Sequence, residues 1–287
     1  MRRPLFCILM LLAVVSAARL EAQELKLATW NLDWLTTRAA GDPRLPPNVR
    51  QRSPEDLARL RDYATRLGAD VLALQEVDGP EAAALILDPA RWTLFFPAED
   101  DVQRVAIAVR RGLPAVQNPD LAALDTQPGA AHSLRRGVDV TVTAGGQPLR
   151  LLAVHLKSGC NQAPLRDGAA CNVLSDQAVV VAGWIAARGA ENAGFAVLGD
   201  FNRRMDHARD PVLLALRRAA PLLRTTEGVS NPCWGGRPFI DHILLGGPAR
   251  GWLRPDSLRV MVFAETGAEW RDRLSDHCPV SVRLLPP

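Results

Sequence analysis

Internal repeats, low-complexity tracts and Gly/Ser linkers are absent from this sequence of 287 residues. Its balance of 48% hydrophobic and 23% charged residues is that of a globular protein, which excludes intrinsic disorder and a collagen-like chain. The lack of a fixed period excludes a solenoid array. We therefore expect one large domain with a sizeable hydrophobic core.

Lysine is scarce and the excess of positive charge is small. Two lysines, Lys26 and Lys157, stand against 32 arginines, which we interpret first as a coding bias and only second as phosphate recognition. The net charge is +3, and it falls to +1 without residues 1–22. Because no long Lys/Arg tract is present, the charge alone does not predict a polyanionic partner.

Long hydrophobic runs are limited to the N-terminus. Arg2 and Arg3 precede an apolar run over residues 5–15, and small residues follow up to Ala18 and Ala22. This pattern predicts a signal peptide over residues 1–22, cleaved after Ala18 or Ala22, with an uncleaved anchor as the alternative. Since a membrane span needs about 20 apolar residues, we expect no integral membrane segment. The expected product is a secreted or periplasmic monomer whose domain covers residues 23–287.

Cysteines are few, and four remain once the N-terminal Cys7 is removed. An even number of cysteines in an exported protein favours disulfides, and four allow three pairings. Cys160 and Cys171 bracket a short loop-like stretch and are the natural local pair. Cys233 and Cys278 would then remain for each other, although Cys278 could equally be a small buried apolar residue.

Hydrophobic periodicity predicts strands and helices in mixed order. A helix should begin after the cap residue Ser53 and end at Gly68. Further helices are predicted over 80–87, 172–188 and 211–218. Strands are predicted over 25–34, 69–77, 104–110, 138–143, 149–156, 195–198, 239–245, 258–263 and 279–284. Buried runs of parallel type occur beside a hairpin at Gly145-Gly146, so we expect a layered α/β sandwich with mixed sheets.

Polar side chains recur at or near the ends of the predicted apolar strands. Buried carboxylates, carboxamides and imidazoles are costly unless they meet partners or a metal. Taken together they form an oxygen-rich set without a thiolate cluster, which suits Mg²⁺, with Mn²⁺ or Ca²⁺ as alternatives, and does not suit Zn²⁺. The members of this set are Asn31, Asp33, Glu76, His155, Asp200, Asn202 and Asp241.

Six short motifs occur in an order that resembles the endonuclease/exonuclease/phosphatase superfamily. They are Thr29-Trp30-Asn31, Gln75-Glu76-Val77, His155-Leu156-Lys157, Gly199-Asp200-Phe201-Asn202, Ile240-Asp241-His242 and Ser275-Asp276-His277. The resemblance extends over residues 25–285. It implies a four-layer α/β sandwich with two packed mixed β-sheets flanked by helices, and a divalent-metal-dependent phosphodiesterase.

The resemblance also implies roles at the metal and at the attacking group. Glu76 would be the main ligand of the cation, helped by Asn31, Asp33 and Asp276. His277 would be the general acid/base, and Asp241 would orient it through the far ring nitrogen. A metal and a base of near-neutral pKa are what in-line attack by water on a phosphodiester requires.

Further residues are implied in phosphate binding. His155 and Asn202 would hold the phosphate, and Asp200 would position the nucleophile or the Asn202 amide. Lys157, Arg104 and Arg203 are the candidates for additional phosphate contacts, with Arg204 next to Arg203. We leave His242 out of the catalytic set, and expect His132 and His207 at the surface.

Two departures from the family's motifs argue against two of its subfamilies, the abasic-site endonucleases and the inositol polyphosphate phosphatases. Abasic-site endonucleases usually carry a tyrosine where this chain has His155, and the Trp-Cys-Asp-Arg signature of inositol polyphosphate phosphatases is missing before Asp241. The leading hypothesis is a nuclease acting on DNA or RNA. A sphingomyelinase-like phospholipid or small-phosphoester hydrolase is the second, and a non-catalytic binding protein the third. The loops 36–52, 113–137, 159–172 and 225–238 should form the specificity walls.

Overall fold

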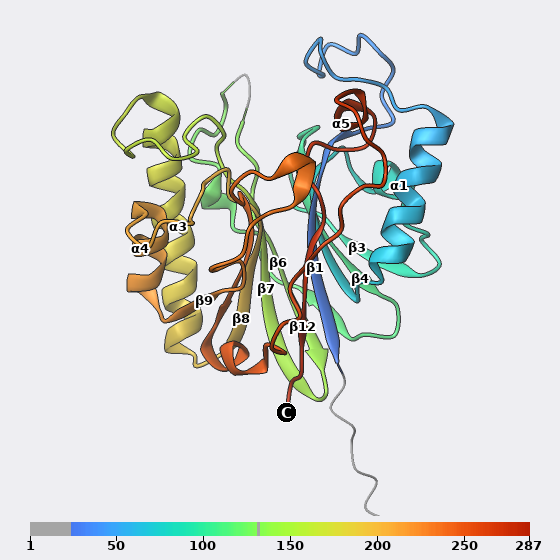
Figure 1. Cartoon of the computed structure of the whole chain (residues 1–287). Helices are drawn as coiled ribbons and strands as arrows, with labels where there is room; N and C mark the ends of the chain where they lie inside the picture. The colour runs from blue at the N-terminus through green and yellow to red at the C-terminus, as the bar shows by residue number, and fades with distance from the viewer. Residues whose placement is uncertain (1–23, 131–132) are drawn as a thin grey trace, which may run out of the picture.

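A computed structural model describes residues 24–130 and 133–287. The predicted signal peptide and His132 lie outside the described residues. Two six-stranded sheets pack face to face and helices cover their outer faces (Figure 1), which confirms the expected four-layer α/β sandwich.

The first sheet has the strand order β11-β12-β1-β2-β4-β3. Its central pair, β1 and β2, is parallel, and its other neighbours are antiparallel. Helix α1 connects the parallel pair and packs on the outer face. The strands are β1 (Leu25–Leu35), β2 (Val71–Val77), β3 (Trp92–Phe95), β4 (Arg104–Arg110), β11 (Arg259–Val260) and β12 (Val280–Leu284).

The second sheet repeats this plan with the order β5-β6-β7-β8-β10-β9. Here β7 and β8 are the parallel pair, and helix α3 connects them. Helices α3 and α4 cover the outer face. The strands are β5 (Ala115–Gln117), β6 (Val138–Ala144), β7 (Gln147–His155), β8 (Gly194–Asp200), β9 (Leu222–Arg224) and β10 (Asp241–Gly246).

Helices begin and end at the signals that the sequence carries. Ser53 and Asp56 form a capping box before α1, and Gly68 ends it in the left-handed conformation. Asp210 caps α4 through its side chain. The helices are α1 (Pro54–Leu67), α2 (Pro80–Ala83), α3 (Ala169–Ala190), α4 (Pro211–Ala219) and α5 (Glu269–Arg273), with 3₁₀ turns at Ala122–Leu124, Cys233–Gly235 and Gly247–Trp252.

Several predicted boundaries were wrong. The helix predicted over 80–87 ends at Ala83, and the strand predicted over 258–263 is reduced to Arg259–Val260. The strand predicted over 239–245 begins at Asp241, which is therefore the first residue of β10 and not an interior one. Strands β3, β5 and β9 and helix α5 were not predicted because their short sequences carry too few periodic positions.

Three clusters of buried apolar side chains match the four layers. One lies between the two sheets, one beneath α1 and one beneath α3 and α4. Helix α3 is long and apolar enough to cross a membrane by length and composition alone, although we expected no such segment. Its residues Leu174, Ala178, Val181 and Ile185 are buried in the cluster beneath it, so it serves as a core helix here.

Both pairs of cysteines form disulfides. Cys160 is bonded to Cys171 and Cys233 to Cys278. The second bond resolves the alternative left open for Cys278. It joins the loop before β10 to the residue that directly follows His277, so it reaches the end of the sandwich where the polar strand ends meet.

Candidate active site

One row of pairing in the second sheet brings three of the predicted residues together. His155 of β7 is paired with Asp200 of β8, and Asp200 is paired with Asp241 of β10. The strands approach closely because Gly199 precedes Asp200: a Cβ atom there would lie 2.0 Å from the Val154 carbonyl oxygen. Side chains at the same level of three adjacent strands therefore share one site.

The first sheet contributes site residues from stretches where the pairing of its strands is irregular. Pairing of β1 with β2 is regular up to Asn31 and shifts before Leu35, and pairing of β2 with β4 shifts between Leu74 and Val77. Asp33 and Glu76 have positive φ angles of 46° and 59° in these irregular stretches. Such conformations cost about 1–3 kcal/mol each and occur frequently at functional sites.

Hydrogen bonds connect the site residues of the first sheet with those of the second. Nδ2 of Asn31 donates to Oε1 of Glu76 at 3.0 Å and to Oδ2 of Asp200 at 3.1 Å. The Ser275 hydroxyl donates to the Asn31 carbonyl oxygen and accepts from the His277 backbone N–H. The loop that carries His277 is thereby fixed to the end of β1.

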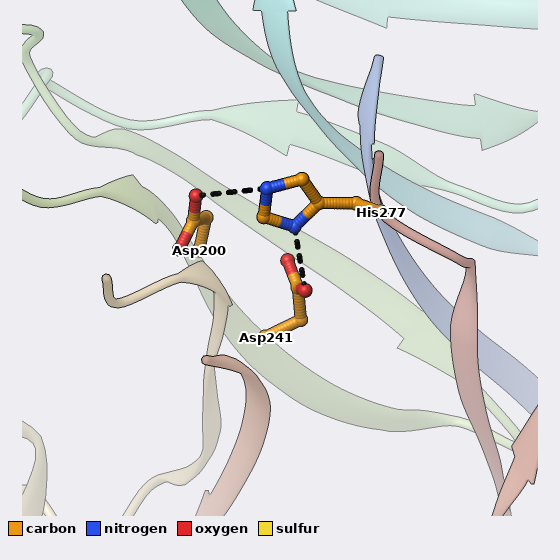
Figure 2. A group of neighbouring side chains, drawn as sticks. All are labelled: Asp200, Asp241 and His277. Atoms are coloured by element: carbon orange, nitrogen blue, oxygen red, sulfur yellow. Dashed lines mark hydrogen bonds and ion pairs between the residues drawn. The ribbon is translucent and has the colours of Figure 1, made fainter. Parts of the chain in front are cut away.

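His277 lies between two carboxylates (Figure 2). Its Nδ1 is 2.7 Å from Oδ2 of Asp241, and its Nε2 is 3.8 Å from Oδ2 of Asp200. Burial opposes the charged imidazolium, but Asp241 and Asp200 outweigh it and raise the pKa of His277 well above the ordinary value. Asp241 thus fixes the ring, and Nε2 faces the centre of the site.

His155 is in the opposite electrostatic state. Its Nε2 lies 3.6 Å from Oε1 of Glu76 and 3.7 Å from Oδ2 of Asp200. Burial, followed by the charges of Arg135, His277 and Lys157, lowers the pKa of His155 well below its ordinary value. The two histidines of the site therefore differ in charge, and His155 is a neutral hydrogen-bonding group.

Burial and neighbouring carboxylates oppose the charged forms of Asp33 and Asp200. Burial and the charges of Asp276 and Glu76 together raise the pKa of Asp33 to about 7, against the opposing charges of Arg52 and His277. Burial likewise raises the pKa of Asp200. A divalent cation would relieve this repulsion, and carboxylate and amide oxygens are ligands that Mg²⁺ and Ca²⁺ accept. The donor set of Glu76, Asn31 and Asp33 therefore fits such an ion.

A second possible cation position lies in the group drawn in Figure 2. Ligand atoms of Asp200, Asp241 and His277 lie within 4.8 Å of one another. Asp241 and His277 already share a hydrogen bond, so we assign them to proton transfer and the Glu76 side to the metal.

Asn202 is held by its neighbours in a strained conformation. Its φ angle is 49°, its backbone N–H donates to Asp200 and its Nδ2 donates to the Leu156 carbonyl oxygen. Its amide is therefore fixed beside Asp200. Asp276 lies 3.6 Å from Nε2 of His277 and is 58% exposed, so it sits at the rim of the site.

Arg203 and Arg104, two of the predicted phosphate contacts, interact with other groups of the protein. Arg203 is buried in an ion pair with Asp210 and donates to the Cys160 and Ala163 carbonyl oxygens, so its prediction as a phosphate contact was wrong. The Arg203 guanidinium thus binds buried groups of the protein itself. Arg104 is 3.9 Å from Asp78 and packs on Phe96.

Lys157 influences the site through its charge, whereas His207 and His242 are not part of the site. The charge of Lys157 lowers the pKa of His155, after burial and the charges of Arg135 and His277. His207 is exposed, as expected. His242 is fully buried and bonded to Thr226 and to the Arg203 carbonyl oxygen, and burial lowers its pKa to about 4. It is a structural residue, consistent with its omission from the catalytic set.

Sequence reasoning missed several arginines around the site. Arg52 donates to the carbonyl oxygens of Leu32, Asp33, Trp34 and Leu274. Arg135 is buried beside the catalytic centre, and its Nη2 is 3.5 Å from the His155 and Leu156 carbonyl oxygens. Both lie in predicted loops, where no periodic pattern indicates which side chains turn inward.

Three more arginines line the cavity that contains His277. Arg204, Arg237 and Arg271 share it with Asp241, Asp276 and Trp234. Within residues 24–130 and 133–287, none of the three forms an ion pair with a carboxylate. Their charge is therefore available to an anion in the cavity.

A model of the Endonuclease/Exonuclease/phosphatase family matches residues 28–277. No curated protein sequence matches this chain significantly. The fold is similar to that of TDP2 from Caenorhabditis elegans, with a TM-score of 0.61 and 17% identity over 94% of this chain and 77% of that chain.

Two DNA complexes have similar folds. TDP2 of D. rerio with a single-strand DNA product has a TM-score of 0.59 at 20% identity, covering 91% of this chain and 98% of that chain. The 3′ phosphatase NExo from Neisseria, bound to a product DNA hairpin, has a TM-score of 0.58 at 19% identity, covering 91% and 99%. At these identities the likeness shows a shared fold.

Proposed function

Since this chain belongs to the endonuclease/exonuclease/phosphatase family, whose members hydrolyse phosphoester bonds, we propose that it is an exported, divalent-metal-dependent phosphodiesterase that cleaves nucleic acid. The observation that carries the proposal is the convergence of Glu76 and Asn31, from one sheet, with Asp200, from the other, beside His277. These groups supply a cation site and a proton-transfer pair in one buried place.

Each residue has a part in the proposed hydrolysis. Glu76, with Asn31 and Asp33, would hold a cation that neutralises charge on the phosphoryl oxygens. Water attacks phosphorus in line, and its proton passes to the Asp200–His277 pair, whose facing atoms are 3.8 Å apart. A new P–O bond forms, the P–O bond to the leaving group breaks, and a proton returns to the leaving oxygen.

The remaining polar groups hold the substrate and the ring. Asp241 keeps Nδ1 of His277 hydrogen-bonded and so directs Nε2 at the reacting atoms. Neutral His155, whose Nε2 lies beside Glu76 and Asp200, would donate to a phosphoryl oxygen. The Asn202 amide already donates to the Leu156 carbonyl oxygen and to Asp200, so it would hold Asp200 in place and not the phosphate. Arg135 contributes positive charge close to Glu76 and Asp200 without neutralising either in a direct ion pair.

The choice of a nucleic acid rests on the arginines of the His277 cavity. Arg204, Arg237 and Arg271 line the same cavity as His277 and Asp276, so a second phosphate of the same strand could bind there. A polymer with a phosphate at every nucleotide provides this second anion, whereas a zwitterionic phospholipid headgroup does not. DNA complexes of proteins with this fold agree with such a substrate.

A substrate panel with plasmid DNA, RNA, sphingomyelin and an inositol phosphate, each with Mg²⁺ and with a chelator, tests the proposal. We expect cleavage of DNA or RNA that the chelator abolishes. Turnover of sphingomyelin alone would overturn the nucleic-acid assignment, and full activity in chelator would overturn the metal mechanism.

The salt dependence of nucleic-acid cleavage tests the arginines separately. Replacing Arg204, Arg237 and Arg271 with alanine should reduce the slope of log(kcat/KM) against log(salt) by about 2–3, because each phosphate contact contributes about 0.7–0.9. Arg218→Ala, an exposed arginine on α4, is the matched control and should leave the slope unchanged. An unchanged slope in the triple variant would show that these arginines do not contact the substrate.

Export is the remaining part of the proposal. Two disulfides are compatible with an oxidising compartment, and the apolar run after Arg2 and Arg3 fits a signal peptide. Mass spectrometry of protein recovered outside the cytoplasm should show a mature chain that begins near residue 19 or 23. A chain that retains Met1 would contradict cleavage.

A further inference from the structure

A second cavity opens on the other flank of the catalytic centre. It measures about 690 Å³, within the range of small-molecule sites, and its lining includes Trp34, Leu45, Pro46, Pro47 and Val102. Trp34 follows the proposed metal ligand Asn31 by three residues, and Arg135, also in the lining, contacts the His155 carbonyl oxygen. The cavity therefore adjoins the end of β1 that carries Asn31 and the strand end that carries His155.

Trp34 is not placed there by packing. Its indole is half-buried, and Trp34 belongs to none of the three core clusters of the described residues. Its φ angle is 63°, a left-handed conformation that a bulky side chain rarely adopts. The strain of this conformation is maintained without a compensating burial of the ring.

The surrounding structure holds this conformation. Arg52 donates to the Leu32, Asp33 and Trp34 carbonyl oxygens in succession, so the turn that presents the indole is fixed from behind. A fixed, partly exposed aromatic ring at the edge of a cavity is suited to stacking, because little side-chain entropy is lost when a ligand binds.

The chemistry of the cavity selects a planar aromatic group over a phosphate. Arg44, at its edge, is already paired with Asp100, and Asp101 adds further negative charge. The face near the indole is made of proline, leucine and valine side chains. Arg135, also in the lining, is buried, and its Nη2 lies 3.5 Å from the His155 and Leu156 carbonyl oxygens, so it connects the cavity wall to the strand end that carries His155.

We propose that Trp34 is a specificity-determining residue that stacks on an aromatic ring of the substrate. This inference rests on the proposed function, under which the ring is a nucleobase adjoining the cleaved phosphodiester. The substrate then spans the site, with a base against Trp34 on the cation side and a further phosphate against the arginines of the His277 cavity. Stacking of one base on an aromatic side chain contributes about 1–3 kcal/mol, or about 5–150-fold in affinity.

The test compares an oligonucleotide with its counterpart that lacks the bases flanking the cleavage site. We expect the wild type to favour the base-bearing substrate by about tenfold or more in kcat/KM. Trp34→Gly, which removes the ring and suits the positive φ, should abolish this preference through KM and leave the base-free substrate nearly unaffected. Trp34→Phe should retain most of the preference. Asn192→Gly relieves a positive φ far from the site and should change neither substrate.

Loss of activity on both substrates in Trp34→Gly, or an unchanged preference, would overturn the stacking role. If the wild type cleaves no nucleic acid at all, the proposed function fails and binding then decides the inference. In calorimetry with a chelator, a nucleoside monophosphate should bind the wild type more tightly than ribose 5-phosphate does, and Trp34→Gly should equalise the two affinities. Equal affinities in the wild type would refute the proposal.

Discussion

The two sheets contribute to the site by different structural means. In the second sheet, His155, Asp200 and Asp241 lie in one regular row of paired strands, and hydrogen bonds between side chains position them. In the first sheet, Asp33 and Glu76 lie where strand register shifts and φ is positive. The two carboxylates that flank His277 are thus on regular strands, whereas Asp33 and Glu76 of the cation site are on strained backbone.

Each half also has its own support outside the sheet. Arg52 supports the first by binding four carbonyl oxygens around residues 32–34 and Leu274. The Cys233–Cys278 disulfide supports the second by fixing the residue next to His277. Hydrogen bonds from Arg52 thus support the cation half, and a disulfide together with the hydrogen bonds of Ser275 supports the loop that carries His277.

Removing the charge of Glu76 should have the largest effect, because it removes the main ligand of the cation half. Glu76→Gln should lower kcat/KM by about 10³–10⁴-fold, since a metal ion contributes several kcal/mol to the transition state. Steady-state kinetics over a range of Mg²⁺ concentrations measures this. Glu81→Gln removes an equal charge from an exposed site nearby and should have no effect. Wild-type activity in Glu76→Gln would place the metal elsewhere.

The proton-transfer half should act as a unit. His277→Ala should lower kcat by about 10²–10⁴-fold, and Asp241→Asn somewhat less, because the ring loses its orienting partner. The double variant should be no slower than His277→Ala, since Asp241 acts through that ring. Additive losses would show an independent role for Asp241, and His207→Ala, on the surface, is the control.

Weakening the support of the cation half should have an intermediate effect. Arg52→Lys keeps the charge but cannot reach all four carbonyl oxygens, so buried acceptors lose partners at about 1–3 kcal/mol each. We expect a lower melting temperature and a kcat/KM reduced about tenfold, which corresponds to about 1.4 kcal/mol. Arg50→Lys, exposed and two residues away, should behave as wild type. If Arg52→Lys kept wild-type activity at a saturating metal concentration, the strained turn would not contribute to catalysis.

The two disulfides should have the smallest effect on activity, and an unequal one. Cys233→Ser with Cys278→Ser opens a loop with a sequence separation of 45, and Cys160→Ser with Cys171→Ser one with a separation of 11. Chain-entropy estimates give about 4 and about 3 kcal/mol of lost stability. Below the melting temperature, only the first pair should reduce kcat, by a few-fold, because it adjoins His277. Equal kcat values would show that this bond supports the fold alone.

The sequence by itself determined the class of fold and most of the central groups. Alternating and buried apolar runs fix strand identity because side-chain period is a local property, and caps such as Ser53 and Gly68 fix helix ends. Asn31, Glu76, Asp200 and Asp241 were predicted because polar residues at the ends of apolar strands must meet partners.

Only the tertiary structure decided what the loops do. Arg203 and Arg204 are adjacent in the sequence, yet Asp210 and two carbonyl oxygens hold the first in the interior while the second lines the His277 cavity. Arg52, Arg135 and Trp34 likewise acquire their positions from groups tens or hundreds of residues away. The direction of a loop side chain depends on which distant carbonyl, carboxylate or cavity it meets, and no local period encodes that choice.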